Sequence, residues 1–165
     1  TLSLLKKVVS WVREVNPSQP ITTAVYEWSV DDWAIIENLS ELDQFIIKSS
    51  DIISYHDYGD KQGAIRRIEG LKKYNRPMIC SEYIAREFNS TFKDILPLFK
   101  ENKIGAYNWG FVSGKTNTIY PWKSWDSTYT GPPKKWHHDL YYENGEPFSV
   151  DEIELIKETI SSVND

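Results

Sequence analysis

Apolar residues recur at helical spacing in five stretches of the chain. Within each stretch, Leu, Ile, Val or Phe stand three or four positions apart, so that they share one face of a helix. This pattern predicts helices over residues 1–15, in short pieces through 47, around 64–71, over 91–101 and from 149 onward. Ser40 and Ser149 are expected N-caps, the latter within a Ser149-x-x-Glu152 capping box. Pro97 is expected to kink or split the fourth helix.

Four short runs rich in β-branched residues alternate with these helices. The runs start near residues 21, 51, 78 and 104, which places successive starts 26 to 30 residues apart. An interval of this size fits one β-α unit with its crossover helix. Three runs carry, at or near their ends, a residue able to bind or react: His56, Glu82 and Trp109. Because the carboxyl ends of parallel barrel strands open onto one face, we expect these side chains to converge.

The number of predicted units limits the fold. A complete (β/α)8 TIM barrel takes about 250 residues, whereas this chain has 165 residues and four predicted strands. We therefore predict a single α/β domain over residues 1–165 with the architecture of half a barrel. The self-contained alternative is a small open doubly wound sheet. The Gly-rich phosphate loop of the dinucleotide-binding form of that fold does not follow Val25.

Composition and charge narrow the class of partner. A net charge of −5 argues against a nucleic-acid or anionic-membrane partner, because phosphate binding normally requires a basic surface. No apolar run approaches the roughly 20 residues of a membrane-spanning helix. Aromatic residues make up 14% of the chain, including seven Trp and ten Tyr. Flat rings of this kind either fill the core or stack on the faces of sugars, so the composition is compatible with a carbohydrate partner.

Three motifs at the predicted strand ends carry a family resemblance. Residues 51–58 (DIISYHDY), 76–86 (RPMICSEYIAR) and 105–111 (GAYNWGF) resemble strands six, seven and eight of clan A glycoside hydrolases, in particular bacterial cellulase-like members. The likeness continues through residues 114–118, 121–122 and 136–140, and so covers nearly the whole chain from Pro20 onward. It implies a retaining (β/α)8 enzyme that hydrolyses β-linked polysaccharides or oligosaccharides without a metal or cofactor. It also implies an extracellular or periplasmic location.

The resemblance assigns roles to individual residues. It implies that Glu82 is the catalytic nucleophile, that Trp109 floors the sugar subsite, and that His56 and Tyr58 line the same subsite. The general acid/base of the family is a glutamate that follows an asparagine at the end of strand four, and no Asn-Glu pair occurs before Pro20. The resemblance therefore implies that this chain is the carboxyl-terminal half of the barrel and that the acid/base lies upstream.

Other tryptophans and the exposed strand edges of a half barrel predict a carbohydrate partner and a protein partner, respectively. Trp28, Trp122 and Trp125 lie at or beyond predicted strand ends, where they are expected either to add stacking surface for the sugar or to pack within loops. Half a barrel leaves unpaired strand edges, which predicts either self-association or a tightly held amino-terminal half.

Several alternatives remain open at this point. Glu82 could be a structural carboxylate paired with Arg86 or another cation, and Glu27 could supply a second carboxylate if the chain is self-contained. The whole molecule could be a non-catalytic carbohydrate-binding or interaction domain that uses its aromatic rim. The His137-His138-Asp139 run invites a metal-site interpretation, but adjacent histidines usually diverge and no further ligand stands at a recognised spacing. Cys80, the single cysteine, is expected to be a buried and inert thiol.

Overall fold

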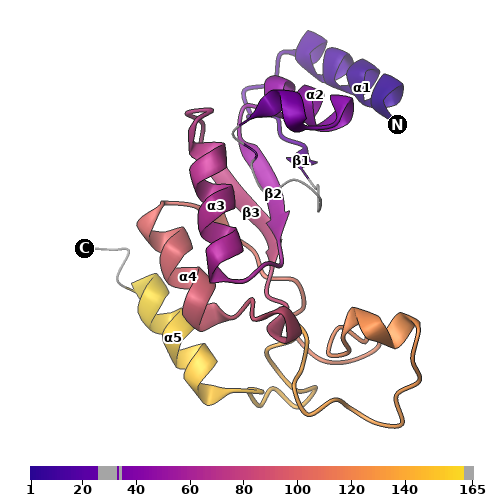
Figure 1. The fold of residues 1–165 in the computed structure, drawn as a ribbon, viewed down its shortest axis with the longest axis vertical. Helices are drawn as coiled ribbons and strands as arrows, with labels where there is room; N and C mark the ends of the chain where they lie inside the picture. The colour runs from indigo at the N-terminus through magenta and orange to yellow at the C-terminus, as the bar shows by residue number, and fades with distance from the viewer. Residues whose placement is uncertain (26–32, 34, 162–165) are drawn as a thin grey trace.

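A four-stranded parallel sheet forms the centre of the molecule (Figure 1). The computed structural model describes residues 1–25, 33 and 35–161. The sheet has the order β1-β2-β3-β4, and every described neighbouring pair is parallel. Its strands are β1 (Ala24–Val25), β2 (Ile53–Asp57), β3 (Met78–Tyr83) and β4 (Gly105–Ala106). The chain is thus a mixed α/β protein, as its alternating pattern predicts.

The strand order is sequential, and this has a consequence for the helices. In a doubly wound sheet the order reverses at a switch point, so that helices cover both faces. Here each new strand adds on the same side of the previous one. Because parallel crossovers are right-handed, helices that connect such strands fall on one face of the sheet. The described strands therefore do not fit the doubly wound alternative.

Five α-helices and three 3₁₀ turns accompany the strands among the described residues. The helices are α1 (Leu2–Val15), α2 (Glu41–Ser49), α3 (Lys61–Lys72), α4 (Phe92–Glu101) and α5 (Val150–Ser161). The 3₁₀ turns are η1 (Ile36–Asn38), η2 (Arg86–Phe88) and η3 (Trp122–Trp125). In Figure 1, α1 and α2 lie at one end of the molecule, and the loop that carries η3 lies at the other. The arrow of β2 points toward the η3 end, so the carboxyl ends of the strands face that loop.

Side-chain caps fix where the helices begin. The hydroxyl of Ser40 accepts a hydrogen bond from the amide of Asp43, and that of Ser149 accepts one from the amide of Glu152, which confirms both predicted N-caps. Helix α4 runs without a break through Pro97, so the predicted split is wrong. The helix buries Phe92, Ile95 and Phe99 on one face. The free energy gained by this burial outweighs the loss of the one backbone hydrogen bond that Pro97 removes.

The two outer strands are shorter than the sequence predicts. The predicted fourth strand covers residues 104–109, but only Gly105 and Ala106 form β4. Backbone hydrogen bonds nevertheless continue beyond it, from the amide of Tyr107 to the carbonyl of Cys80 (2.9 Å) and from the amide of Trp109 to that of Tyr83 (3.2 Å). The described part of the first strand is likewise only Ala24–Val25. Glycine and asparagine are poor strand formers, which explains the early end of β4.

Helix α1 is bound to the sheet through Asp51. The carboxylate of Asp51 accepts hydrogen bonds from Arg13 at 2.9 and 2.8 Å and from the amide of Ile21 at 2.8 Å. No residue of α1 is buried. Val8 and Val15, two of the apolar residues that recur along this helix, are exposed. Helix α1 packs against α2 rather than into the main core, so its other side faces solvent.

Candidate functional site

Glu82 lies on the strand β3, beside the end of β2. The register of the parallel pair sets His56 opposite Glu82, after an irregularity between Tyr55 and His56. The irregularity shifts the pairing by one residue, so that His56 and Glu82 become neighbours near the carboxyl ends of both strands. The side chains of His56 and Glu82 are 23% and 24% exposed. Solvent, and hence a ligand, can reach the carboxylate.

Two side chains contact the same oxygen of Glu82. The phenol hydroxyl of Tyr58 donates a hydrogen bond to Oε2 at 2.6 Å, and Nδ1 of His56 lies 3.3 Å from that oxygen. No described residue donates a hydrogen bond to Oε1. The carboxylate is therefore held by one oxygen and presents the other. The structure thus brings together three of the predicted site residues: His56, Tyr58 and Glu82.

An aromatic cluster supports Tyr58 from behind. The Trp122 ring meets that of Tyr58 edge-on, with centroids 5.0 Å apart, and the His138 ring lies 5.5 Å from that of Tyr58. Trp122 also packs against Phe88 and His137. Trp122 is half-buried. Its contact with Tyr58 is consistent with a structural role, as an alternative to the predicted role of a stacking surface for the sugar.

The chain leaves β3 through a strained residue. Ile84 has a φ of 73°, in the left-handed region that β-branched residues strongly avoid, and it is completely buried. Such conformations cost about 1–3 kcal/mol and persist only where the surroundings impose them. The carbonyl oxygen of Ile84 is hydrogen-bonded to Nδ1 of His138. Because a carbonyl only accepts, Nδ1 of His138 carries the proton.

Residues 136–139 form a buried polar segment whose role the sequence did not reveal. The carbonyl of His137 accepts a hydrogen bond from the amide of Arg86 at 3.1 Å. One carboxylate oxygen of Asp139 accepts a hydrogen bond from Thr118 at 2.7 Å. The bonds from Arg86 to His137 and from His138 to Ile84 hold the backbone that follows Glu82, and the bond from Thr118 fixes Asp139 of the same segment. The unusual His-His-Asp run was the one available signal, and its burial could not be read from sequence.

His137 is buried and stays neutral. Burial lowers the pKa of His137 to about 4, and the nearby charges of His138, Arg86 and Lys135 act in the same direction. Burial also lowers the pKa of His138. Neither ring nitrogen of His137 has a hydrogen-bond partner among the residues that the structure describes. Among the same described residues, no group of three or more His, Cys, Asp or Glu side chains is placed to hold a metal ion.

Arg86 does not pair with Glu82. Its guanidinium forms a two-pronged ion pair with Glu152 of α5, at 3.0 Å from Nε and 2.6 Å from Nη2. A structural ion pair between Glu82 and Arg86 is therefore wrong, whereas pairing of Glu82 with another cation stays open through its contact with His56. The capping box is also only half formed, because the Glu152 side chain turns to Arg86 instead of back to the amide of Ser149. This pair attaches the end of β3 to α5.

Trp109 lies next to the site along the backbone. Its amide bonds to the carbonyl of Tyr83, and its side chain is 46% exposed. The residue after it, Gly110, has a φ of 83° and passes close to the 138–139 segment. A Cβ at Gly110 would lie 2.7 Å from a carboxylate oxygen of Asp139, so only glycine fits there. Trp28 and Glu27 lie outside the described residues.

Two other strand residues serve the core rather than the site. Cys80 is buried, and burial raises its thiol pKa well above the ordinary value, so a reactive thiolate is disfavoured. Asp57, the last residue of β2, forms a buried ion pair with Arg67 of α3 at 2.8 Å. Asp57 therefore points toward the helix layer, as expected for the residue that alternates with His56.

The fold and the site together define an α/β protein with a supported carboxylate at the carboxyl end of a parallel sheet. No model of a protein family matches the chain, and no curated protein matches it significantly. In the described residues, no helix is both long and apolar enough to cross a membrane. The geometry around Glu82 is therefore the main indication of function.

Proposed function

We propose that this chain belongs to a retaining β-glycoside hydrolase and that Glu82 is its nucleophile. The observation that carries the proposal is the contact of Tyr58 and His56 with the same oxygen of Glu82. The hydrogen bond from Tyr58 stabilises the negative charge of the carboxylate, and the contacts of Tyr58 and His56 with Oε2 fix its orientation, while Oε1 has no described donor. A nucleophilic carboxylate needs this combination of fixed orientation and a free lone pair.

The strand order supports the larger architecture that goes with this activity. Consecutive parallel strands in the order β1-β2-β3-β4 are what one segment of a (β/α)8 barrel contains. A mainly apolar hollow of about 690 Å³ lies beside β4, between α4 and α5. In a closed barrel another strand would pair with β4 and cover apolar surface at this edge. We therefore propose that β4 pairs with an amino-terminal half of the barrel, or with a second copy of the chain.

The reaction requires a second carboxyl group. In the first step, Oε1 of Glu82 forms a bond to the anomeric carbon, and the glycosidic oxygen leaves with the bonding pair and takes a proton from a carboxylic acid. Water then displaces Glu82 with help from the same group, now ionised. Two described residues, Tyr58 and His56, contact the Glu82 carboxylate, and neither carries a carboxyl group. We assign the acid/base to a glutamate upstream in a longer chain, with Glu27 as the alternative.

A mechanism-based label tests the nucleophile independently of the acid/base. A fluorinated dinitrophenyl glycoside has a leaving group so stable as an anion that it departs without protonation. Attack by Glu82 should therefore form a covalent glycosyl ester, visible by mass spectrometry as an adduct on the peptide that contains Glu82. Glu82→Gln should give no adduct. Labelling of a different residue, or undiminished hydrolysis by Glu82→Gln, would refute the assignment.

The competing function is a carbohydrate-binding domain that cleaves nothing. It is favoured if sugars bind to the wild type and to Glu82→Gln equally, while the label never reacts.

Light scattering over a micromolar concentration series tests the proposed pairing of β4 with another chain. We expect association that weakens in Tyr107→Lys, because a charged residue beside an exposed strand edge opposes pairing. Tyr107 is 66% exposed, so the change should not disturb the fold.

A further inference from the structure

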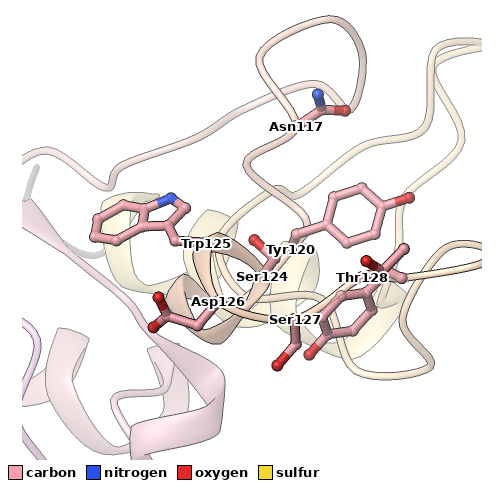
Figure 2. A pocket seen from close by; sticks show the side chains of 8 residues that line it. Asn117, Tyr120, Ser124, Trp125, Asp126, Ser127 and Thr128 are labelled. Atoms are coloured by element: carbon pink, nitrogen blue, oxygen red, sulfur yellow. The ribbon is translucent and has the colours of Figure 1, made fainter.

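We propose that the hollow beside η3 is an outer subsite for a carbohydrate chain that extends from Glu82. The hollow has a volume of about 530 Å³, and its lining residues are Asn117, Tyr120, Ser124, Trp125, Asp126, Ser127, Thr128 and Tyr129 (Figure 2). The inference rests on the proposed function and adds to it the length of the substrate. It makes the substrate an oligomer or polymer rather than a single sugar with a small leaving group.

The chemistry of the lining fits a neutral polyol. Five of the lining residues carry hydroxyl groups, and one carries an amide. None of these polar side-chain groups hydrogen-bonds to another described residue, so all of them are available to a ligand. The lining contains a single charged residue, Asp126, and no lysine or arginine. An anionic ligand such as a phosphate ester would lack a cation there, whereas the hydroxyls of a sugar find both donors and acceptors.

The exposure of Trp125 points to a stacking platform. Its side chain is 81% exposed, the highest value among the large hydrophobic residues described. Figure 2 shows the indole at one margin of the hollow with Asp126 nearby, and Tyr120 and Thr128 toward the other side. A flat ring with one open face beside polar groups suits the apolar face and the polar edge of a sugar ring.

The backbone around the hollow is fixed by turns. The amide of Tyr120 bonds to the carbonyl of Asn117 at 3.1 Å, and the amide of Ser124 bonds to that of Pro121 at 2.8 Å. The rings of Tyr120 and Tyr129 meet edge-on, with centroids 5.4 Å apart. The subsite is thus largely formed before a ligand arrives, which lowers the entropic cost of binding.

The 3₁₀ turn joins the hollow to the Glu82 site. Trp122 begins η3 and contacts Tyr58, which in turn holds Glu82, while Trp125 ends the same turn. Side chains three residues apart in a 3₁₀ helix lie one above the other, about 6 Å along the axis. This is a distance comparable to one sugar ring of an extended β-linked chain. The same turn thus carries a support of the Glu82 site and the exposed ring at the hollow, which is the basis for assigning both to one glycan.

Calorimetric titration with oligomers of increasing length tests the inference. The probes are β-linked oligomers of glucose, xylose and mannose, from dimers to hexamers. For the series that binds, affinity should rise with length, and Trp125→Ala should weaken hexamer binding about tenfold or more while changing dimer binding less than about twofold. Trp11→Ala is the matched control, because Trp11 is also exposed but lies on α1 at the other end of the molecule. It should bind every oligomer as the wild type does.

The outcomes separate this inference from the proposed function. If Trp125→Ala binds hexamers as tightly as the wild type, or if no oligomer binds measurably, the outer subsite is refuted even when Glu82 is labelled. If length-dependent binding disappears in Trp125→Ala but Glu82 is never labelled, the subsite stands and the hydrolase assignment fails. Retained binding by Glu82→Gln, together with loss in Trp125→Ala, supports the subsite directly.

Discussion

Nδ1 of His138 is hydrogen-bonded to the carbonyl oxygen of Ile84, a residue 54 positions earlier in the chain. Both residues are almost completely buried, and Ile84 has a backbone conformation that an isoleucine rarely adopts. Ile84 stands two residues after Glu82 and directly follows β3. The contact therefore joins a residue late in the chain to the backbone that positions the proposed nucleophile. His138 acts here as a positioning residue, through Ile84 and through the Tyr58 ring.

Replacing His138 should separate its hydrogen bond from its ring. His138→Leu leaves the buried carbonyl of Ile84 without a donor, which costs about 1–3 kcal/mol of unfolding free energy. His138→Asn keeps an N–H close to the position of Nδ1 and should recover part of this loss. Urea unfolding measures the difference, and the labelling rate of Glu82 should follow the same order. Equal values for both variants would show that the hydrogen bond contributes nothing.

Removing the Tyr58 hydroxyl should slow the reaction of Glu82. In Tyr58→Phe the ring still packs on Trp122, but the 2.6 Å hydrogen bond to Oε2 is lost. This bond fixes the orientation of the attacking carboxylate, and loss of such positioning should lower the labelling rate about tenfold or more. Tyr107→Phe is the control, because Tyr107 is an exposed tyrosine outside these contacts. A wild-type rate in Tyr58→Phe would remove Tyr58 from the mechanism.

Three glycines allow a matched test of the loop after β4. Gly110→Ala combines a positive φ with contacts of 2.7 and 2.9 Å to Asp139 and His138, so we expect a loss of about 3 kcal/mol or more in unfolding free energy. Gly145→Ala has a similar φ of 85° but open space around it, so only the backbone cost of about 1–2 kcal/mol applies. Gly131→Ala has neither problem and should be nearly neutral. Chemical denaturation gives all three values, and equal losses at Gly110 and Gly145 would contradict the close packing on His138.

The free energy of unfolding should fall as the pH drops through the range in which His137 titrates. His137 has a pKa of about 4 in the folded state against about 6.5 when unfolded, so the unfolded chain binds more protons between these values. The contribution of neutral His137 to the free energy of unfolding is therefore complete above about pH 6.5. It is lost progressively as the pH falls to about 4. Its size is about 3 kcal/mol. Unfolding measured between pH 7 and 5 should show a shallower slope in His137→Phe, which keeps a ring but does not titrate. An unchanged slope would contradict the buried neutral state.

Local patterns were sufficient to predict much of the framework. The caps at Ser40 and Ser149 and the alternation of strands and helices depend on nearby sequence. The direct pairing of His56 with Glu82 depends in addition on the register shift between Tyr55 and His56. Such features involve residues close in sequence, or strands whose order follows from short crossovers. The proximity of Tyr58 to Glu82 was implied by the family resemblance, and the structure places Tyr58 directly after β2 and Glu82 near the end of the adjacent β3.

Features that depend on distant partners could not be predicted. Glu152 matches a capping box, yet its side chain binds Arg86, which stands 66 residues earlier and needs a buried anion. The φ of Ile84 contradicts the local preference of isoleucine and is imposed by the tertiary contacts around it. Pro97 likewise stays inside α4 because burial of that helix outweighs a local penalty. In each case tertiary packing overrides a local rule.

The connection between β3 and the 136–152 region also sets an order of events during synthesis. The partners of Ile84 and Arg86 emerge from the ribosome 54 to 66 residues after them. At about 5–20 residues per second, this is a delay on the order of 3–13 s. Throughout that time β3 can pair with β2, but the turn after Glu82 lacks its contacts with His138 and Glu152. The nascent chain thus carries its carboxylate in an unfinished setting until its last helix has been made.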